Sequence, residues 1–297
     1  MTDAPAPARA RALRARSIPG MLTASPLLVL LLFAFFAPLL LVLLFSFMPR
    51  GSFTLGSHFT LANYIDIVEQ GFYISYIWSL VIAVSSVVAL LLICYPLALA
   101  ITRLGGRMSL IVMLLVIMPL FVSDSIRLLG FVFILDKGGV LDGLTTLLFG
   151  WGTGNLANTV PSVVVATMYI NFPFMLFPLI LALSGVPASV REAAYDLGAT
   201  RWQVMRDIEF PLAMPGVLIG SIMCFVLSLG TFTEAKLVGR GTIITITQDI
   251  ESAFNYGQNW PRGSAISVTV VLIAMAAVVL AFRSVDLGKL LRGSGDT

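Results

Sequence analysis

The sequence has few charged residues and few of the side chains that catalytic and metal sites usually need. Lys, Arg, Asp and Glu make up 11% of its 297 residues, whereas an ordinary globular domain has about 25%. The one histidine, His58, and the two cysteines, Cys94 and Cys224, stand far apart in the chain. No CxxC pair, Cys/His cluster, HExxH motif or phosphate-binding GxxxxGKS/T loop occurs. We therefore expect a chain that is not an enzyme and that binds no metal or cofactor of its own.

Long apolar runs dominate the chain instead. Hydrophobic residues make up 58% of it. A bilayer span needs about 20 such residues in a helix, because lipid offers the backbone no hydrogen-bond partner. The first run, Met21–Met48, exceeds the roughly 7–15 apolar residues of a signal peptide, so we interpret it as a span. The six predicted spans are Met21–Phe47, Trp78–Ile101, Met108–Leu129, Val160–Leu183, Leu212–Leu229 and Ala265–Arg283.

Lys and Arg residues predict the orientation of these spans. With the N-terminus in the cytoplasm, twelve of the 18 Lys and Arg residues fall on the inner side and six on the outer side. The predicted fold class is an all-α integral membrane protein with six transmembrane helices and both termini cytoplasmic. We divide the chain into a cytoplasmic N-terminal tail (1–20), a six-helix membrane domain (21–285) and a cytoplasmic C-terminal tail (286–297).

An elaborate inner loop, residues 186–211, precedes the fifth span. Ser189 and Glu192 have the spacing of a capping box, which predicts a helix that begins at Val190. Gly198 stands where a residue with left-handed backbone would end this helix. The loop therefore begins with one short helix.

A second short helix should follow directly. Thr200 and Gln203 repeat the capping-box spacing, and Pro211 is expected to end this helix and begin the next span. Such a helical pair exposes apolar side chains on a rigid protrusion, which indicates a docking partner. The alternative is that the pair packs onto its own bundle or lies among lipid headgroups. The exposed residues are Ala193, Ala194, Tyr195 and Leu197.

The loop resembles the EAA loop of ABC importer permeases. Glu192-Ala193-Ala194 and Gly198 match its first half. Nine residues separate Gly198 from Ile208, which with Pro211 matches its second half. Phe210 replaces the usual Leu of the motif. In that family the loop forms coupling helices that sit in a groove of the cytoplasmic ATPase subunit. The resemblance implies that the ATPase-docking residues are Glu192, Ala193, Ala194, Tyr195, Leu197 and Gly198.

Three further stretches are similar to the spermidine/putrescine-type permease subgroup: Pro119–Gly130, Asn171–Leu179 and Asn259–Ala265. The resemblance implies a multi-pass subunit of the bacterial inner membrane that imports a polyamine and contacts lipid but no nucleic acid. Its implied partners are a second homologous permease, two cytoplasmic ATPases that bind ATP and magnesium, and a periplasmic solute-binding protein. An aminophosphonate, an opine or an amino-acid-like solute stays open, and a stand-alone secondary transporter is a less favoured alternative.

One segment departs from that subgroup. The subgroup commonly has an uncharged stretch that ends in Gly-Gly, whereas this chain has three charged residues there: Glu234, Lys236 and Arg240. These charges argue against a polyamine. Glu234 is nevertheless the best single carboxylate for contacting a cation, although Lys236 could neutralise it.

Candidate pathway residues lie near the outer ends of the spans. Asp124 and Arg127, at positions i and i+3, could line the path, or could form a structural ion pair. Ser228 and Thr231 continue a weakly polar stripe on the fifth span, which close helix packing through its GxxxG motif would also explain. Trp260 could contact an amine, or could belong to an interfacial aromatic belt.

Overall fold

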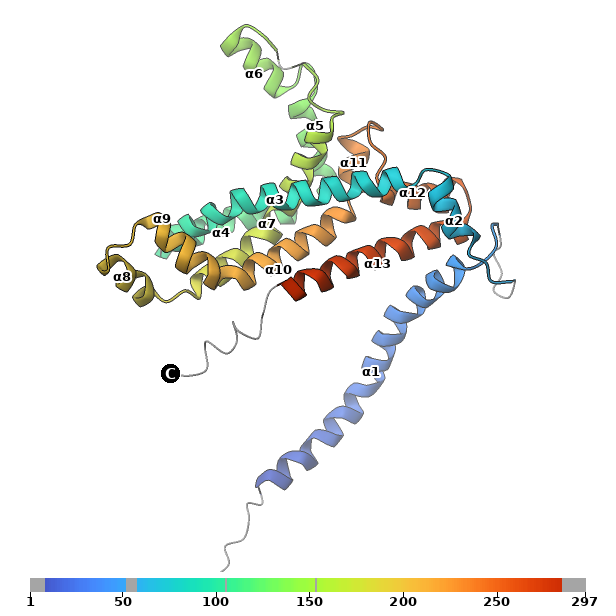
Figure 1. The fold of residues 1–297 in the computed structure, drawn as a ribbon, viewed down its shortest axis with the longest axis horizontal. Coiled ribbons are helices and arrows are strands. Elements are labelled where there is room, and N and C mark those ends of the chain that lie inside the picture. Colours follow the sequence, from blue (N-terminus) through green and yellow to red (C-terminus); the bar gives the residue numbers. More distant parts are fainter. Residues whose placement is uncertain (1–8, 52–57, 105, 153, 285–297) are drawn as a thin grey trace, which may run out of the picture.

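Every regular element in the described part of the chain is a helix (Figure 1), which confirms the predicted all-α class. The computed structural model describes residues 9–51, 58–104, 106–152 and 154–284. The predicted C-terminal tail, 286–297, and the first eight residues of the predicted N-terminal tail lie outside the described residues. The helices are α1 (Arg9–Ser46), α2 (Ala62–Glu69), α3 (Tyr73–Leu104), α4 (Gly106–Ile117), the 3-10 turn η1 (Met118–Phe121), α5 (Asp124–Leu135), α6 (Val140–Phe149), α7 (Val160–Ser184), α8 (Ala188–Asp196), α9 (Arg201–Gln203), the π-helix η2 (Val204–Glu209), α10 (Phe210–Leu229), α11 (Thr233–Leu237), α12 (Ile246–Glu251), the π-helix η3 (Ser252–Tyr256) and α13 (Trp260–Ser284).

The core lies where α3, α7 and α10 pack against one another. Leu176 and Leu179 of α7 are fully buried there. The GxxxG motif of α10 allows the close approach, since a Cβ at Gly216 would lie 2.5 Å from the carbonyl oxygen of Pro178. Small residues at a helix interface let backbones come together in this way. This packing fixes the ends of the three helices, and one of these ends carries the predicted docking loop.

The predicted third span, Met108–Leu129, is wrong as a single helix. The segments Gly106–Phe121 and Asp124–Phe149 are bent by 100° relative to each other, and the break between them follows Met118–Phe121. Pro119 removes a backbone donor in that turn, and Val122 and Ser123 take backbone angles outside the helical region. As a result α5 and α6 project away from the layer of long helices (Figure 1).

The first helix stands apart from the core. It begins at Arg9 rather than at the predicted Met21. None of the apolar window in Ser25–Ser46 is buried. In Figure 1 the C-terminal end of α1 meets α13, and the rest of α1 points away from the bundle. Among the described residues, five helices are long and apolar enough to cross a membrane, or six if the bent pair counts as one span. The described part of the chain thus has several candidate spans, and a count of six depends on the broken third segment.

Candidate functional site

The first helix of the predicted docking loop begins earlier than expected. α8 starts at Ala188, with Pro187 as its N-cap, and no side chain caps it. The capping box predicted for Ser189 and Glu192 is therefore wrong, because Ser189 already lies inside the first turn. The predicted end is confirmed: Gly198 has a φ of +84°. Its N–H and the next one donate to carbonyls of the last turn, 2.9 and 3.0 Å away, which closes a Schellman motif.

The second helix does not stop at Pro211. The predicted capping box at its start is confirmed, because the Thr200 hydroxyl accepts from the Gln203 N–H and the Thr200 N–H donates to the Gln203 side chain. From Arg201 the helix runs through η2 into α10 without a break, up to Leu229. The π-type hydrogen bonding of η2 is a common way for a helix to continue past a residue that disturbs the regular pattern, here Pro211. The loop is therefore joined rigidly to the helix at the centre of the core.

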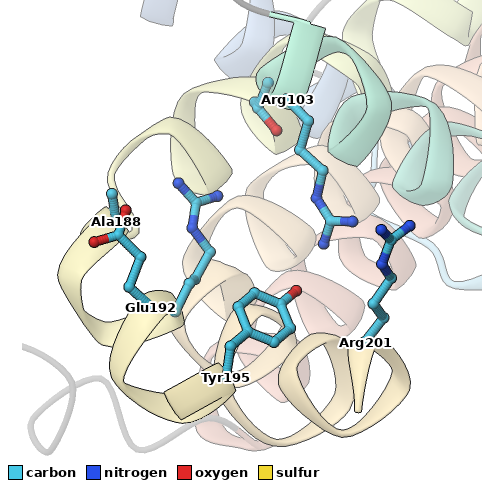
Figure 2. A pocket seen from close by; sticks show the side chains of 7 residues that line it. Arg103, Ala188, Glu192, Tyr195 and Arg201 are labelled. Carbon is cyan, nitrogen blue, oxygen red and sulfur yellow. The ribbon is translucent and has the colours of Figure 1, made fainter. Parts of the chain in front are cut away.

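The predicted docking residues form an exposed surface at one end of the bundle. α8 has no buried residue, and the side chain of Leu197 is 89% exposed. Beside it, between α8, α9 and the end of α3, lies a pocket of about 610 Å³. In Figure 2, Arg103 and Arg201 extend toward each other across this pocket, and the Tyr195 hydroxyl lies beside them. The pocket is thus predominantly polar and rich in arginine.

A buried carboxylate that the sequence analysis missed lies next to this pocket. Glu209, at the end of η2, is 0% exposed. Arg103 donates to both of its oxygens, at 3.1 and 2.9 Å, and Arg191 of α8 lies 3.6 Å from one of them. Its position three residues before the predicted span Leu212–Leu229 was the signal that could have singled out Glu209, because charges near membrane depth usually have a partner. The arrangement connects α3, α8 and the start of α10 at one point.

Asp124 and Arg127 form the expected ion pair at the start of α5. The Asp124 side chain is 61% exposed, whereas that of Arg127 is 6% exposed and lies against the Tyr169 ring, 5.8 Å from its centroid. Arg127 lines an apolar pocket of about 470 Å³ between α3, α4 and α7. Its Nε and Nη1 atoms have no hydrogen-bond partner among the described residues. A guanidinium with two free donors therefore borders this pocket.

The charged segment after α10 is arranged differently from what its sequence suggested. Lys236 donates to both oxygens of Glu251, at 2.8 and 3.0 Å, and Arg240 donates to Asp136 at 2.8 Å. The prediction that Lys236 could neutralise Glu234 is therefore wrong. In the described part of the chain, no basic side chain lies within salt-bridge distance of Glu234.

The environment of Glu234 also changes its proton affinity. Burial raises the pKa of Glu234, and the negative charge of Asp124 raises it further, so these two carboxylates lie close enough to interact. α11, which carries Glu234, packs against α5. Asp124, Arg127 and Glu234 thus form one cluster with an excess of negative charge, on the side that the sequence predicted to be outer; it is called the outer cluster below.

The remaining pathway candidates are engaged in helix packing. Ser228 is fully buried, and its hydroxyl accepts from the Asn171 amide of α7 at 3.0 Å. Thr231 is 3% exposed, and its carbonyl accepts from the Thr245 hydroxyl at 3.1 Å. The Trp260 ring packs against Phe45 of α1 and Phe254 of η3. The structure joins none of these three to the outer cluster by a described contact.

Comparison with known families agrees with this geometry. Residues 93–287 match the family described as "Binding-protein-dependent transport system inner membrane component". The chain belongs to that family. It is therefore a permease component of a binding-protein-dependent ABC importer, and its apolar helices make it a multi-pass protein of the bacterial inner membrane.

Several curated permeases are similar over most of their length. The spermidine/putrescine transport system permease protein PotB of Haemophilus influenzae is 29% identical over 80% of this chain and 84% of its own. The PotB protein of Escherichia coli strain K12 is 28% identical over 76% and 82%. The inner membrane ABC transporter permease protein YdcU of the same strain is 30% identical over 75% and 74%. The resemblance to the polyamine-type subgroup is thus confirmed.

Solved structures show the same fold. A crystal structure of a bacterial ABC transporter involved in the import of alginate contains a chain with a TM-score of 0.72. It covers 92% of this permease and 98% of its own length at 17% identity. A second structure, of a bacterial alginate ABC transporter in complex with an alginate-bound periplasmic protein, gives 0.73. At this identity the likeness concerns the fold alone.

Proposed function

We propose that this permease forms the membrane path of an ATP-driven polyamine importer together with a second, homologous permease. Six spans place both termini in the cytoplasm, with the bent third segment counted as one span. Two cytoplasmic ATPase subunits dock at Glu192–Gly198 and hold the ATP and magnesium, and a periplasmic binding protein delivers the solute to the outer face. The permease itself is not a catalyst and binds no cofactor or metal.

The shape of α8 supports ATPase docking. α8 has no buried residue and projects from the bundle as a rigid unit. A Schellman motif holds its C-terminal end, and the segment that leads from α7 holds its N-terminal end. Tyr195 and Leu197 are 41% and 89% exposed. Exposed apolar side chains on a rigid element are typical of an interaction site.

The isolation of α1 supports a second permease. A spanning helix that buries none of its apolar window within its own chain is surrounded by lipid or by a partner. In the bilayer, helices associate through packing rather than through the hydrophobic effect. The C-terminal end of α1 is anchored by the contact of Phe45 with Trp260, which leaves the rest of the helix available to the partner.

Glu234 is the observation that carries the polyamine assignment. A partly buried carboxylate with no basic partner in the described residues favours a cation, and the second carboxylate of Asp124 lies near it. In the sequence, the positive charges of Lys236 and Arg240 argued against a polyamine. Both are paired with other carboxylates, Glu251 and Asp136, so this objection no longer holds. In this proposal Asp124 and Glu234 receive ammonium groups, and Arg127 and Tyr169 border the next part of the path. Ser228, Thr231 and Trp260 shape that path by holding the helices around it.

The proposal is tested by ATPase stimulation in liposomes. The assembled complex, with its binding protein, is offered spermidine, putrescine, an aminophosphonate, an opine and a simple amino acid. Stimulation by the polyamines alone is expected. Stimulation by an anionic or zwitterionic solute would support the importer function but overturn the polyamine assignment. The Nε and Nη1 atoms of Arg127, which lack a hydrogen-bond partner among the described residues, would then be the first groups to examine.

A further inference from the structure

The buried carboxylate of Glu209 lies where three elements with different roles converge. It ends the π-helix η2, which continues the docking loop into α10. Its side chain is 1% exposed. Such a group is stable as an ion only when cationic partners and hydrogen bonds compensate for the lost hydration. The positions of those partners therefore constrain the surrounding helices.

The partners of Glu209 come from two other helices. Arg103, in the last turn of α3, binds both carboxylate oxygens, and this two-pronged geometry fixes the relative orientation of α3 and α10. About two turns before it, the Tyr95 ring meets the Phe210 ring edge-on, with centroids 5.5 Å apart and with Phe210 next to Glu209. The cytoplasmic ends of α3 and α10 are thus joined by a polar and an aromatic contact.

The link to α8 is of a different kind. α8 buries no residue, so packing alone holds it weakly. Arg191 of α8 lies 3.6 Å from Glu209, and it is the single ion pair that α8 makes in the described part of the chain. A movement of α8 therefore reaches the buried carboxylate directly, and through it Arg103 and α3.

We propose that Glu209 is a positioning residue that makes α8, α3 and α10 move together when the ATPase subunits close. This inference rests on the proposed function, because it assumes that the ATPases dock on α8. Two guanidinium groups share the carboxylate of Glu209. Arg103 holds α3 against α10 through two short hydrogen bonds, and Arg191 links α8 to the same carboxylate by a longer contact. The π-helix next to it is a type of element that often marks functional sites in helices.

The test uses Glu209→Gln in the assembled transporter, which removes the charge but keeps the size of the side chain. ATP hydrolysis without solute is expected to continue, whereas solute moved per ATP falls about tenfold, within the usual range of coupling between sites. Asp207→Asn is the matched control, because this carboxylate is on the same π-helix but is 65% exposed. It should leave both quantities unchanged.

A second variant and a distance measurement separate coupling from folding. Arg191→Gln changes only the exposed helix and leaves the Arg103 contact with Glu209, and it is expected to uncouple in the same way even if Glu209→Gln fails to assemble. Spin labels on α8 and α3 should keep their separation when ATP binds to the wild type and change it in both variants. Normal transport per ATP in either variant would overturn the inference. Failure of the wild-type permease to co-purify with an ATPase would instead overturn the proposed function.

Discussion

Gly198 offers a sharp test of the docking surface, because its backbone requires glycine while its surroundings are open. Its φ is +84°, and a Cβ built there would meet nothing within 4 Å. Any other residue therefore adds only backbone strain, about 1–2 kcal/mol for a left-handed L-residue. That strain changes the population of the native turn by a factor of about 5–30. Gly198→Trp adds an indole at the same exposed position, where the proposed ATPase would dock.

We expect Gly198→Trp to insert into the membrane at normal yield but to lose ATPase co-purification, with solute uptake reduced at least about tenfold. Gly71→Trp is the matched control: its φ is +79°, its Cβ also meets nothing within 4 Å, and it lies just before α3 at the opposite end of the bundle. It carries the same strain and should retain ATPase binding. Normal co-purification and uptake with Gly198→Trp would refute the assignment of the docking surface.

Two further predictions concern the helix core and the outer cluster. Gly216→Leu should destabilise the permease by about 1–3 kcal/mol, because its Cβ would lie 2.5 Å from the Pro178 carbonyl oxygen. The control is Gly130→Leu, where an added Cβ meets nothing within 4 Å. It should leave the melting temperature of the detergent-solubilised protein unchanged. Burial raises the pKa of Glu234 above its ordinary 4.5, so uptake that needs its ionised form should decline as the pH falls through this raised pKa. The fold binds that proton more tightly than the unfolded chain, so Glu234 costs stability as the pH rises, and Glu234→Gln should lower uptake while raising the melting temperature at neutral pH. Equal uptake in Glu234→Gln and in the exposed control Glu69→Gln would contradict its assigned role.

The long apolar segments were predictable because their cause is local. The predicted Val160–Leu183 and Leu212–Leu229 differ from α7 and α10 by at most two residues at each end. A backbone that enters lipid has to satisfy its own hydrogen bonds, so length and composition suffice to identify such helices. The turn at Gly198 and the capping box at Thr200 were equally local and were predicted correctly.

Local rules failed where a neighbouring residue or the packed core overrode the local signal. Ser189 and Glu192 have capping spacing, but the extended backbone of Pro187 starts α8 two residues before the predicted position. Pro211 is a helix breaker by its chemistry, yet η2 and α10 continue through it because the packed core holds the helix on both sides. Another proline, Pro119, lies in the 3-10 turn just before the break between Phe121 and Asp124, where the chain bends by 100°.

The sequence by itself determined the long apolar helices, the turn at Gly198 and the family resemblance of the loop, since these depend on neighbouring residues and on spacing along the chain. Only the tertiary structure decided which charges from different helices and loops meet, whereas the i, i+3 pair of Asp124 and Arg127 could be named from the sequence. Arg103 and Glu209 are 106 residues apart in the chain, and Lys236 binds Glu251, 15 residues away, rather than the nearby Glu234. Ion pairing depends on distance through space and on burial, which arise only when helices pack. Both the ion-paired carboxylate of Glu209 and the carboxylate of Glu234, which has no basic partner among the described residues, follow from that packing.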